Sequence, residues 1–155
     1  MGKILLVEDD GLITKDLSDK LKDFDYEVQT AYSYVSAIDC WEKHKGNFDC
    51  IILDLNIDPS NLDPKKSSKY IPICGMAFLE DILNGEYNPE IRGVKKESIT
   101  KLDDLKKVII YSGFIETLTQ RKCNFKCYDQ LTQPIFKSTI NMENLINEVE
   151  RIINK

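Results

Sequence analysis

Acidic and amide side chains gather directly after two short apolar runs of the sequence. They are Glu8, Asp9 and Asp10 after the first run, and Asp54 and Asn56 after the second. Carboxylates held close together destabilise one another unless a cation neutralises them, and a ligand set made only of oxygens favours a hard ion such as Mg²⁺. If the two runs end side by side, these residues form a metal site, and Asp54 becomes a candidate phosphoryl acceptor.

The two apolar runs have the character of short buried strands. Residues 3–8 and 49–54 are apolar along most of their length, and each run opens at its carboxyl end into an acidic turn. Runs of this kind are typical of parallel sheets, whose ligands collect at the carboxyl ends of the strands. Two such ends side by side would put three or four carboxylates into one small pocket.

The remaining segments alternate between strand-like and helix-like patterns. Strands are predicted at residues 3–8, 26–31, 49–54, 107–111 and, from a weaker pattern, 125–131. Helices are predicted at residues 11–24, from the N-cap Ser33 to about Lys45, from Gly75 onward, and at residues 114–122 and 138–154. Five strand–helix units imply a parallel sheet with helices on both faces, because crossover connections are right-handed. The predicted fold is therefore α/β, a doubly wound five-stranded parallel sheet of flavodoxin-like order.

Two connections are longer than a minimal version of this fold needs. They are residues 57–74 and 85–104, predicted as insertions after the third strand and after the third helix. Loops of this length are uncommon and are often functional or mobile. Because residues 57–74 begin close to Asp54, we expect them to contact a partner or to shield the pocket, and we expect their basic run 65–69 to be solvated. The chain otherwise fits a single domain, 1–155, with no output domain.

Composition and charge disfavour several classes of protein. The chain has 155 residues and a net charge of −5, which argues against a nucleic-acid partner. No apolar stretch approaches the ~20 residues that a membrane span needs, and the N-terminus shows no signal-peptide pattern, so no membrane association is expected. The five cysteines are odd in number and lack the spacing of a disulfide framework or a zinc site. A reducing cytoplasm is the simplest location.

Four motifs together resemble the receiver domain of two-component response regulators, the CheY-like superfamily. Residues 4–10 are similar to the first strand and acidic pair of that family, and residues 51–56 to the strand that carries the phosphorylated aspartate. Residues 108–113 are similar to the strand that ends in a switch Ser or Thr, and residues 131–134 occupy the place of the Lys-Pro motif. The resemblance covers nearly the whole chain apart from the two insertions, and the motifs occur in the family's order.

The resemblance implies a role for each matching residue. Asp54 would accept the phosphoryl group from the phosphohistidine of a histidine kinase or a phosphotransfer partner. Mg²⁺ would be held by Asp9 and Asp54, with Glu8 acting through water or assisting Asp9. The backbone carbonyl of Asn56 would add a further ligand. Ser112 would hydrogen-bond a phosphoryl oxygen after the transfer.

The resemblance further implies a stand-alone response regulator. Such a protein is a phosphoacceptor rather than an enzyme, and at most it catalyses its own phosphorylation and dephosphorylation. Its modified surface would bind a downstream protein partner, and a homodimer is left open.

Several positions do not match the family. Gln133 stands at the position of the family's lysine, and its amide can form hydrogen bonds but cannot supply an ammonium to the phosphoryl oxygens. Lys137 lies beyond the proline and is not expected to reach the pocket. The aromatic switch position falls at Gln130, with Tyr128 as a candidate substitute. Asp10 matches no ligand position and is predicted to cap the first helix.

Two other functions stay open. A pseudo-receiver adaptor would keep the fold and signal without phosphate, as Gln130 and Gln133 suggest. A Mg²⁺-dependent phosphohydrolase, similar to the haloacid dehalogenases, would use Asp54 as its nucleophile. Those enzymes usually carry a second acid where this chain has Asn56, which ranks the phosphohydrolase below the other two functions.

Overall fold

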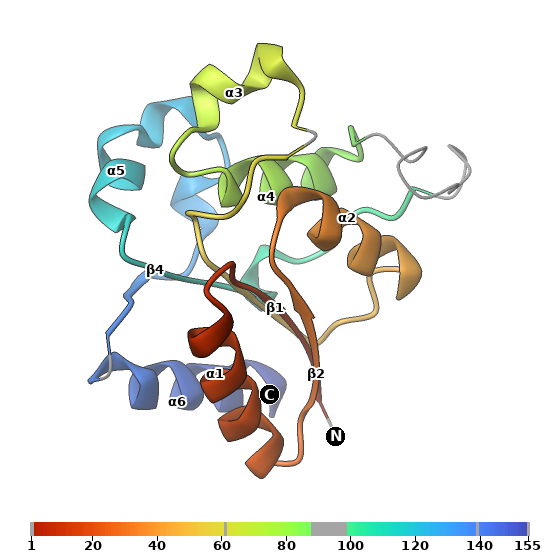
Figure 1. Cartoon of the computed structure of the whole chain (residues 1–155), viewed down its shortest axis with the longest axis vertical. Coiled ribbons are helices and arrows are strands. Elements are labelled where there is room, and N and C mark those ends of the chain that lie inside the picture. Colours follow the sequence, from red (N-terminus) through yellow and green to blue (C-terminus); the bar gives the residue numbers. More distant parts are fainter. Residues whose placement is uncertain (1, 61, 88–98, 139, 155) are drawn as a thin grey trace.

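A five-stranded parallel sheet forms the centre of the molecule (Figure 1). The computed structural model describes residues 2–60, 62–87, 99–138 and 140–154. The strands are β1 Lys3–Val7, β2 Glu27–Ala31, β3 Cys50–Leu53, β4 Val108–Ser112 and β5 Ile135–Phe136. Their order in the sheet is β2-β1-β3-β4-β5, which confirms the predicted doubly wound α/β fold.

Helices cover both faces of this sheet. In the described residues they are α1 Gly11–Asp23, α2 Tyr34–Lys43, α3 Pro64–Tyr70, α4 Gly75–Asn84, α5 Ile115–Gln120 and α6 Asn141–Ile153, with the short 3₁₀ turns η3 Leu105–Lys107, η4 Lys122–Asn124 and η5 Tyr128–Gln130. One apolar core joins the sheet to α1 and α6, and a second joins it to α2, α4 and α5 (Figure 1). Successive residues of a strand point to opposite faces, so Leu5 lies in one core and Leu6 in the other. No helix in the described part of the chain is both long and apolar enough to cross a membrane.

The two predicted helix caps are confirmed. Asp10 accepts the backbone N–H groups of Leu12 and Ile13 at the start of α1, over 3.0 and 3.2 Å. Ser33 caps α2 reciprocally with Ser36. The Asp10 cap fixes the direction in which the chain leaves β1, directly beside the predicted site.

The prediction of a fifth strand at residues 125–131 is wrong. That segment forms turns that include η5, and the strand lies at Ile135–Phe136, where it pairs with the end of β4. The apolar residues that suggested a strand, such as Phe125 and Cys127, are buried from a turn instead. A strand of two residues is too short to produce an alternating pattern, so the true strand gave no periodic signal.

The insertion at residues 57–74 is part of the apolar core. It contains the helix α3 and buries Ile57, Leu62, Tyr70 and Ile73. This burial gives the insertion a structural role, whereas contact with a partner stays a prediction. The second insertion, residues 85–104, lies partly outside the described residues.

Tyr70 offers a direct test of this structural role. It is 4% exposed, so Tyr70→Ala should leave a cavity and lower the free energy of unfolding by about 3 kcal/mol, as measured by urea denaturation. Lys65→Ala is the control, because Lys65 is exposed on the same helix. If both substitutions have the same small effect, the insertion does not belong to the core.

Candidate functional site

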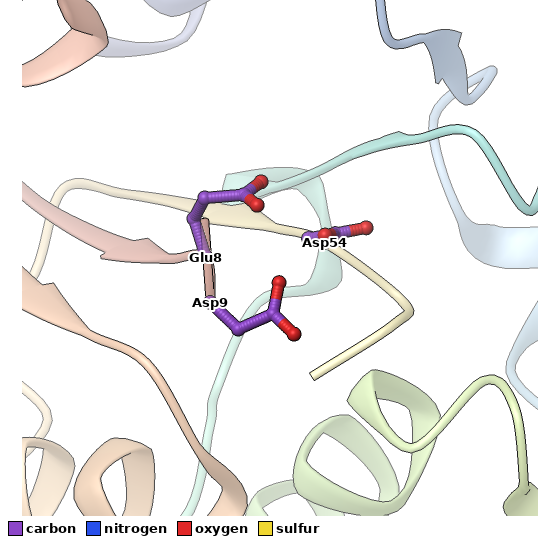
Figure 2. A group of neighbouring side chains, drawn as sticks. All are labelled: Glu8, Asp9 and Asp54. Carbon is purple, nitrogen blue, oxygen red and sulfur yellow. The ribbon is translucent and has the colours of Figure 1, made fainter. Parts of the chain in front are cut away.

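The carboxyl ends of β1 and β3 meet at the centre of the sheet. The two strands are neighbours, with Val7 paired to Leu53, and the N–H of Asp54 donates to the carbonyl of Val7 over 2.9 Å. Glu8, Asp9 and Asp54 therefore lie together, and one carboxylate oxygen from each lies within 4.8 Å of the others (Figure 2). The structure thus gathers the three acidic side chains that the sequence analysis places in one pocket.

Burial raises the pKa of two carboxyl groups in this cluster. Glu8 is 2% exposed and Asp54 is 3% exposed, whereas Asp9 is exposed. Burial, and next the charge of Asp54, raise the pKa of Glu8 to about 7. The same two causes, in the same order, raise the pKa of Asp9. The raised pKa values show that burial and mutual repulsion disfavour the charged carboxylates at this place, and a bound cation would relieve that cost.

A lysine that was not expected to reach the pocket supplies a positive charge inside it. Lys137 directly follows β5, and its ammonium lies 3.0 and 2.8 Å from the two carboxylate oxygens of Glu8 and 2.9 Å from Oδ2 of Asp54. Burial lowers the pKa of this ammonium, but its hydrogen bonds and charge interactions with the two acids outweigh burial, so the pKa is raised overall. Lys137 is a cation shared by two buried acids.

The assignment of Gln133 to the lysine position is wrong. Gln133 precedes β5 and is exposed, whereas Lys137 follows the strand at the edge where the acids lie. The error comes from the misplaced fifth strand, which was predicted to end too early. Gln130 and Tyr128, assigned to the aromatic switch position, lie in η5 rather than on a strand. The usable signal was an apolar pair directly before Lys137, which repeats the apolar-then-charged pattern at the ends of β1 and β3.

Ser112 lies where the sequence predicts it, at the end of β4 and next to the turn that carries Asp54. It is fully buried, and its Oγ accepts the N–H of Leu55 over 3.4 Å and the N–H of Phe114 over 3.1 Å. Leu55 follows Asp54, and Phe114 is the residue before α5. The hydroxyl of Ser112 therefore connects the turn that carries Asp54 to the start of α5.

Backbone amides orient two of the carboxylates. The N–H of Asn56 donates to Oδ1 of Asp54 over 3.3 Å, and the N–H of Asp10 donates to Oε1 of Glu8 over 3.1 Å. Hydrogen bonds of this kind fix the direction of a carboxylate. The role of the Asn56 carbonyl as a metal ligand stays a prediction.

The helix α4 begins where it contacts the turn that carries Asp54. The N–H of Gly75 donates to the carbonyl of Leu55 over 2.7 Å. A Cβ at this position would lie 2.3 Å from the carbonyl oxygen of Asp54 and 2.9 Å from the Cα of Leu55. A side chain cannot be accommodated at these distances, so Gly75 allows α4 to support the turn that carries Asp54.

Comparisons with known proteins identify the fold of the chain. No protein-family model matches the chain, and no curated protein matches it. Solved structures do match. The non-phosphorylated HemR receiver domain of Leptospira biflexa is 17% identical with a TM-score of 0.63, and the match covers 100% of this chain and 96% of that one. The chain has the receiver-domain fold.

Two further structures with the receiver fold contain a magnesium ion. The response regulator TrrA from Thermotoga maritima, in complex with Mg²⁺ and beryllium fluoride, is 18% identical with a TM-score of 0.61, over 98% of this chain and 99% of that one. The receiver domain of a sensor histidine kinase from Pseudomonas aeruginosa has a magnesium ion in its active site cleft. It is 15% identical with a TM-score of 0.56, over 99% of this chain and 98% of that one.

The substitution Gly75→Ala should displace the turn that carries Asp54. The added methyl group meets backbone atoms rather than a flexible side chain, so the free energy of unfolding should fall by about 1–3 kcal/mol in urea denaturation. Gly11→Ala is the matched control, because a Cβ there meets no atom within 4 Å. Equal effects of the two substitutions would contradict the close approach of α4.

The substitution Lys137→Met should leave Glu8 and Asp54 without their shared cation. The expected loss in the free energy of unfolding is about 1–3 kcal/mol without divalent ions, because a buried charge is left unpaired. Mg²⁺ should raise the Tm of the variant more than that of the wild type, in which the ammonium competes for the same oxygens. Lys126→Met, at an exposed position, is the control. A variant as stable as the wild type, or one with no extra response to Mg²⁺, would argue against the shared cation.

Proposed function

We propose that this protein is a receiver that accepts a phosphoryl group on Asp54. The donor is the phosphohistidine of a histidine kinase or a phosphotransfer protein. The proposal is carried by one observation: the buried carboxylate of Asp54 lies among two further acids and the ammonium of Lys137.

The acidic cluster fits Mg²⁺ as a cofactor. Glu8, Asp9 and Asp54 offer oxygen ligands only, which suits a hard divalent cation better than a soft one. In the described part of the chain, three carboxyl groups face the single ammonium of Lys137 in this pocket. When bound, the ion supplies positive charge to the oxygens of the transferring phosphoryl group.

The side chains around Asp54 have distinct roles in the transfer. A carboxylate oxygen of Asp54 attacks the phosphorus, the P–N bond of the phosphohistidine breaks, and its electron pair stays on the imidazole nitrogen, which takes up a proton. Lys137 lies beside Oδ2 of Asp54 and can pair with an oxygen of the incoming group. Ser112 can donate its hydroxyl hydrogen to another phosphoryl oxygen. These roles consist of positioning and charge stabilisation, which dominate phosphoryl transfer.

The same geometry weakens the two alternative functions. The case for a pseudo-receiver adaptor depended on the absence of a lysine, and Lys137 supplies that charge beside Asp54. The case for a phosphohydrolase needs a second acid to act on the leaving group, and the chain has Asn56 at that position. On this proposal the protein is a phosphoacceptor rather than an enzyme, and it signals by binding a partner protein.

Phosphorylation with a small donor tests the proposal. Incubation with Mg²⁺ and acetyl phosphate should add one phosphate to the wild type, detected by intact mass and removed by hydroxylamine, as expected of an acyl phosphate. Asp54→Asn should abolish the modification, because the amide is a poor nucleophile. Asp58→Asn, an exposed aspartate in the same connection, should leave it unchanged. Equal labelling of the wild type and Asp54→Asn would overturn the proposal.

A further inference from the structure

The helix α5 depends on contacts at its two ends. It has six residues, of which only Leu118 is buried, and helices this short gain little stability by themselves. At its N-terminal end, the N–H of Phe114 donates to Oγ of Ser112. At its C-terminal end, the guanidinium of Arg121 donates to the carbonyl of Ile71 over 2.7 Å. One end of α5 is therefore fixed by the candidate site, and the other by the insertion that contains α3.

The contact between α3 and the end of α5 has several parts. Arg121 also donates to the carbonyl of Lys69 over 3.4 Å. The rings of Tyr70 and Phe125 are stacked with centroids 6.0 Å apart, and both residues are buried. The ammonium of Lys69 lies over both rings, 5.2 and 5.5 Å from their centroids. This combination of hydrogen bonds, stacking and cation–π contact attaches α3 to residues 121–125.

The helix α3 also lies beside α4 (Figure 1), and two consecutive acids of α4 contact it. Glu80 accepts the hydroxyl of Tyr70 over 2.6 Å and pairs with the ammonium of Lys69 over 3.2 Å. Asp81 is 3% exposed and pairs with Lys66 over 3.2 Å. It also accepts the hydroxyl of Tyr34, a residue of α2. Asp81 is buried while Lys66 and Lys69 are partly exposed, so the loss of Lys66 would leave a buried carboxylate without its charge partner. These contacts hold α3 against α4.

We propose that residues 64–71 act as a brace that fixes the Arg121 end of α5 to α4. The inference rests on the proposed function in one respect. When the hydroxyl of Ser112 donates its hydrogen to a phosphoryl oxygen on Asp54, the Oγ that accepts the N–H of Phe114 shifts with it, and the N-terminal end of α5 changes. The brace keeps the other end in place, so the change is confined to residues 113–117 and the α3–α5 contact persists.

The brace is tested first without any phosphate analogue. Arg121→Met keeps the aliphatic stem and removes the donors, so the amides of residues 118–121 should exchange with solvent roughly tenfold faster in NMR hydrogen exchange. Lys122→Met, the exposed neighbour, should leave them unchanged, and Arg121→Lys should restore part of the protection. If Arg121→Met exchanges like the wild type, or if exchange rises equally in β1 and β3, the brace is overturned.

A second measurement adds Mg²⁺ and beryllium fluoride as a phosphoryl mimic. Amide shifts of the wild type should change at residues 112–117, and in Arg121→Met the changes should extend through residue 121. Changes that already reach residue 121 in the wild type would overturn the brace. If neither protein responds to the mimic, the proposed function fails, whereas the exchange rates of the first measurement still decide whether the brace exists.

Discussion

Glu8 and Asp54 share one ammonium at a place from which water is largely excluded. Both acids are almost fully buried, and Lys137 bonds to each of them. Removing one partner from such a group leaves a charge that the interior cannot stabilise, so the fold must position all three groups together. The three residues follow three different strands, β1, β3 and β5. The sheet must therefore place β1 beside β3 and also bring the end of β5 to the same edge, which the doubly wound order achieves.

The backbone of Leu55 connects the turn that carries Asp54 to the starts of α4 and α5. Its N–H donates to the hydroxyl of Ser112, and its carbonyl accepts the N–H of Gly75. Ser112 leads into α5, and Gly75 begins α4. Because Leu55 directly follows Asp54, a change of charge or size at Asp54 reaches the starts of both helices through single hydrogen bonds. The missing side chain at Gly75 and the small side chain of Ser112 are what permit these short connections.

The sequence contains enough information to predict the acidic part of the site but not its cation. Glu8, Asp9 and Asp54 could be placed because each follows an apolar run that is long enough to recognise as a strand. Ser112 could be placed for the same reason. Lys137 could not, because its strand has two residues and because an earlier segment, rich in apolar side chains, resembled a strand more closely. Tertiary contacts decide which of two weak patterns becomes the strand, and a local pattern does not record them.

The basic run of the first insertion is largely exposed, as predicted, but it forms part of the helix α3 rather than a loop. Lysines are usually exposed, and nothing in the sequence indicates a further role for these. Two of these lysines also pair with Glu80 and Asp81, acids of a helix that comes later in the chain. The acids lie on α4, whose apolar pattern gives no sign that its polar residues serve as a docking surface. Pairing across such a distance in sequence becomes visible only once α3 and α4 are placed in space.

These contacts join α4 and α5 at two separate points. One runs through Leu55, between Gly75 and Ser112, and the other runs through α3, between Glu80 and Arg121. The two points differ in chemistry. The first depends on a hydroxyl that accepts two backbone N–H groups and can donate its own hydrogen within reach of Asp54. The second depends on stacked rings, carbonyl groups and ion pairs, none of which belongs to the site. On the proposal above, a phosphoryl group on Asp54 would change the surroundings of the first connection and leave the second in place, so the Arg121 end of α5 would keep its contact with α3.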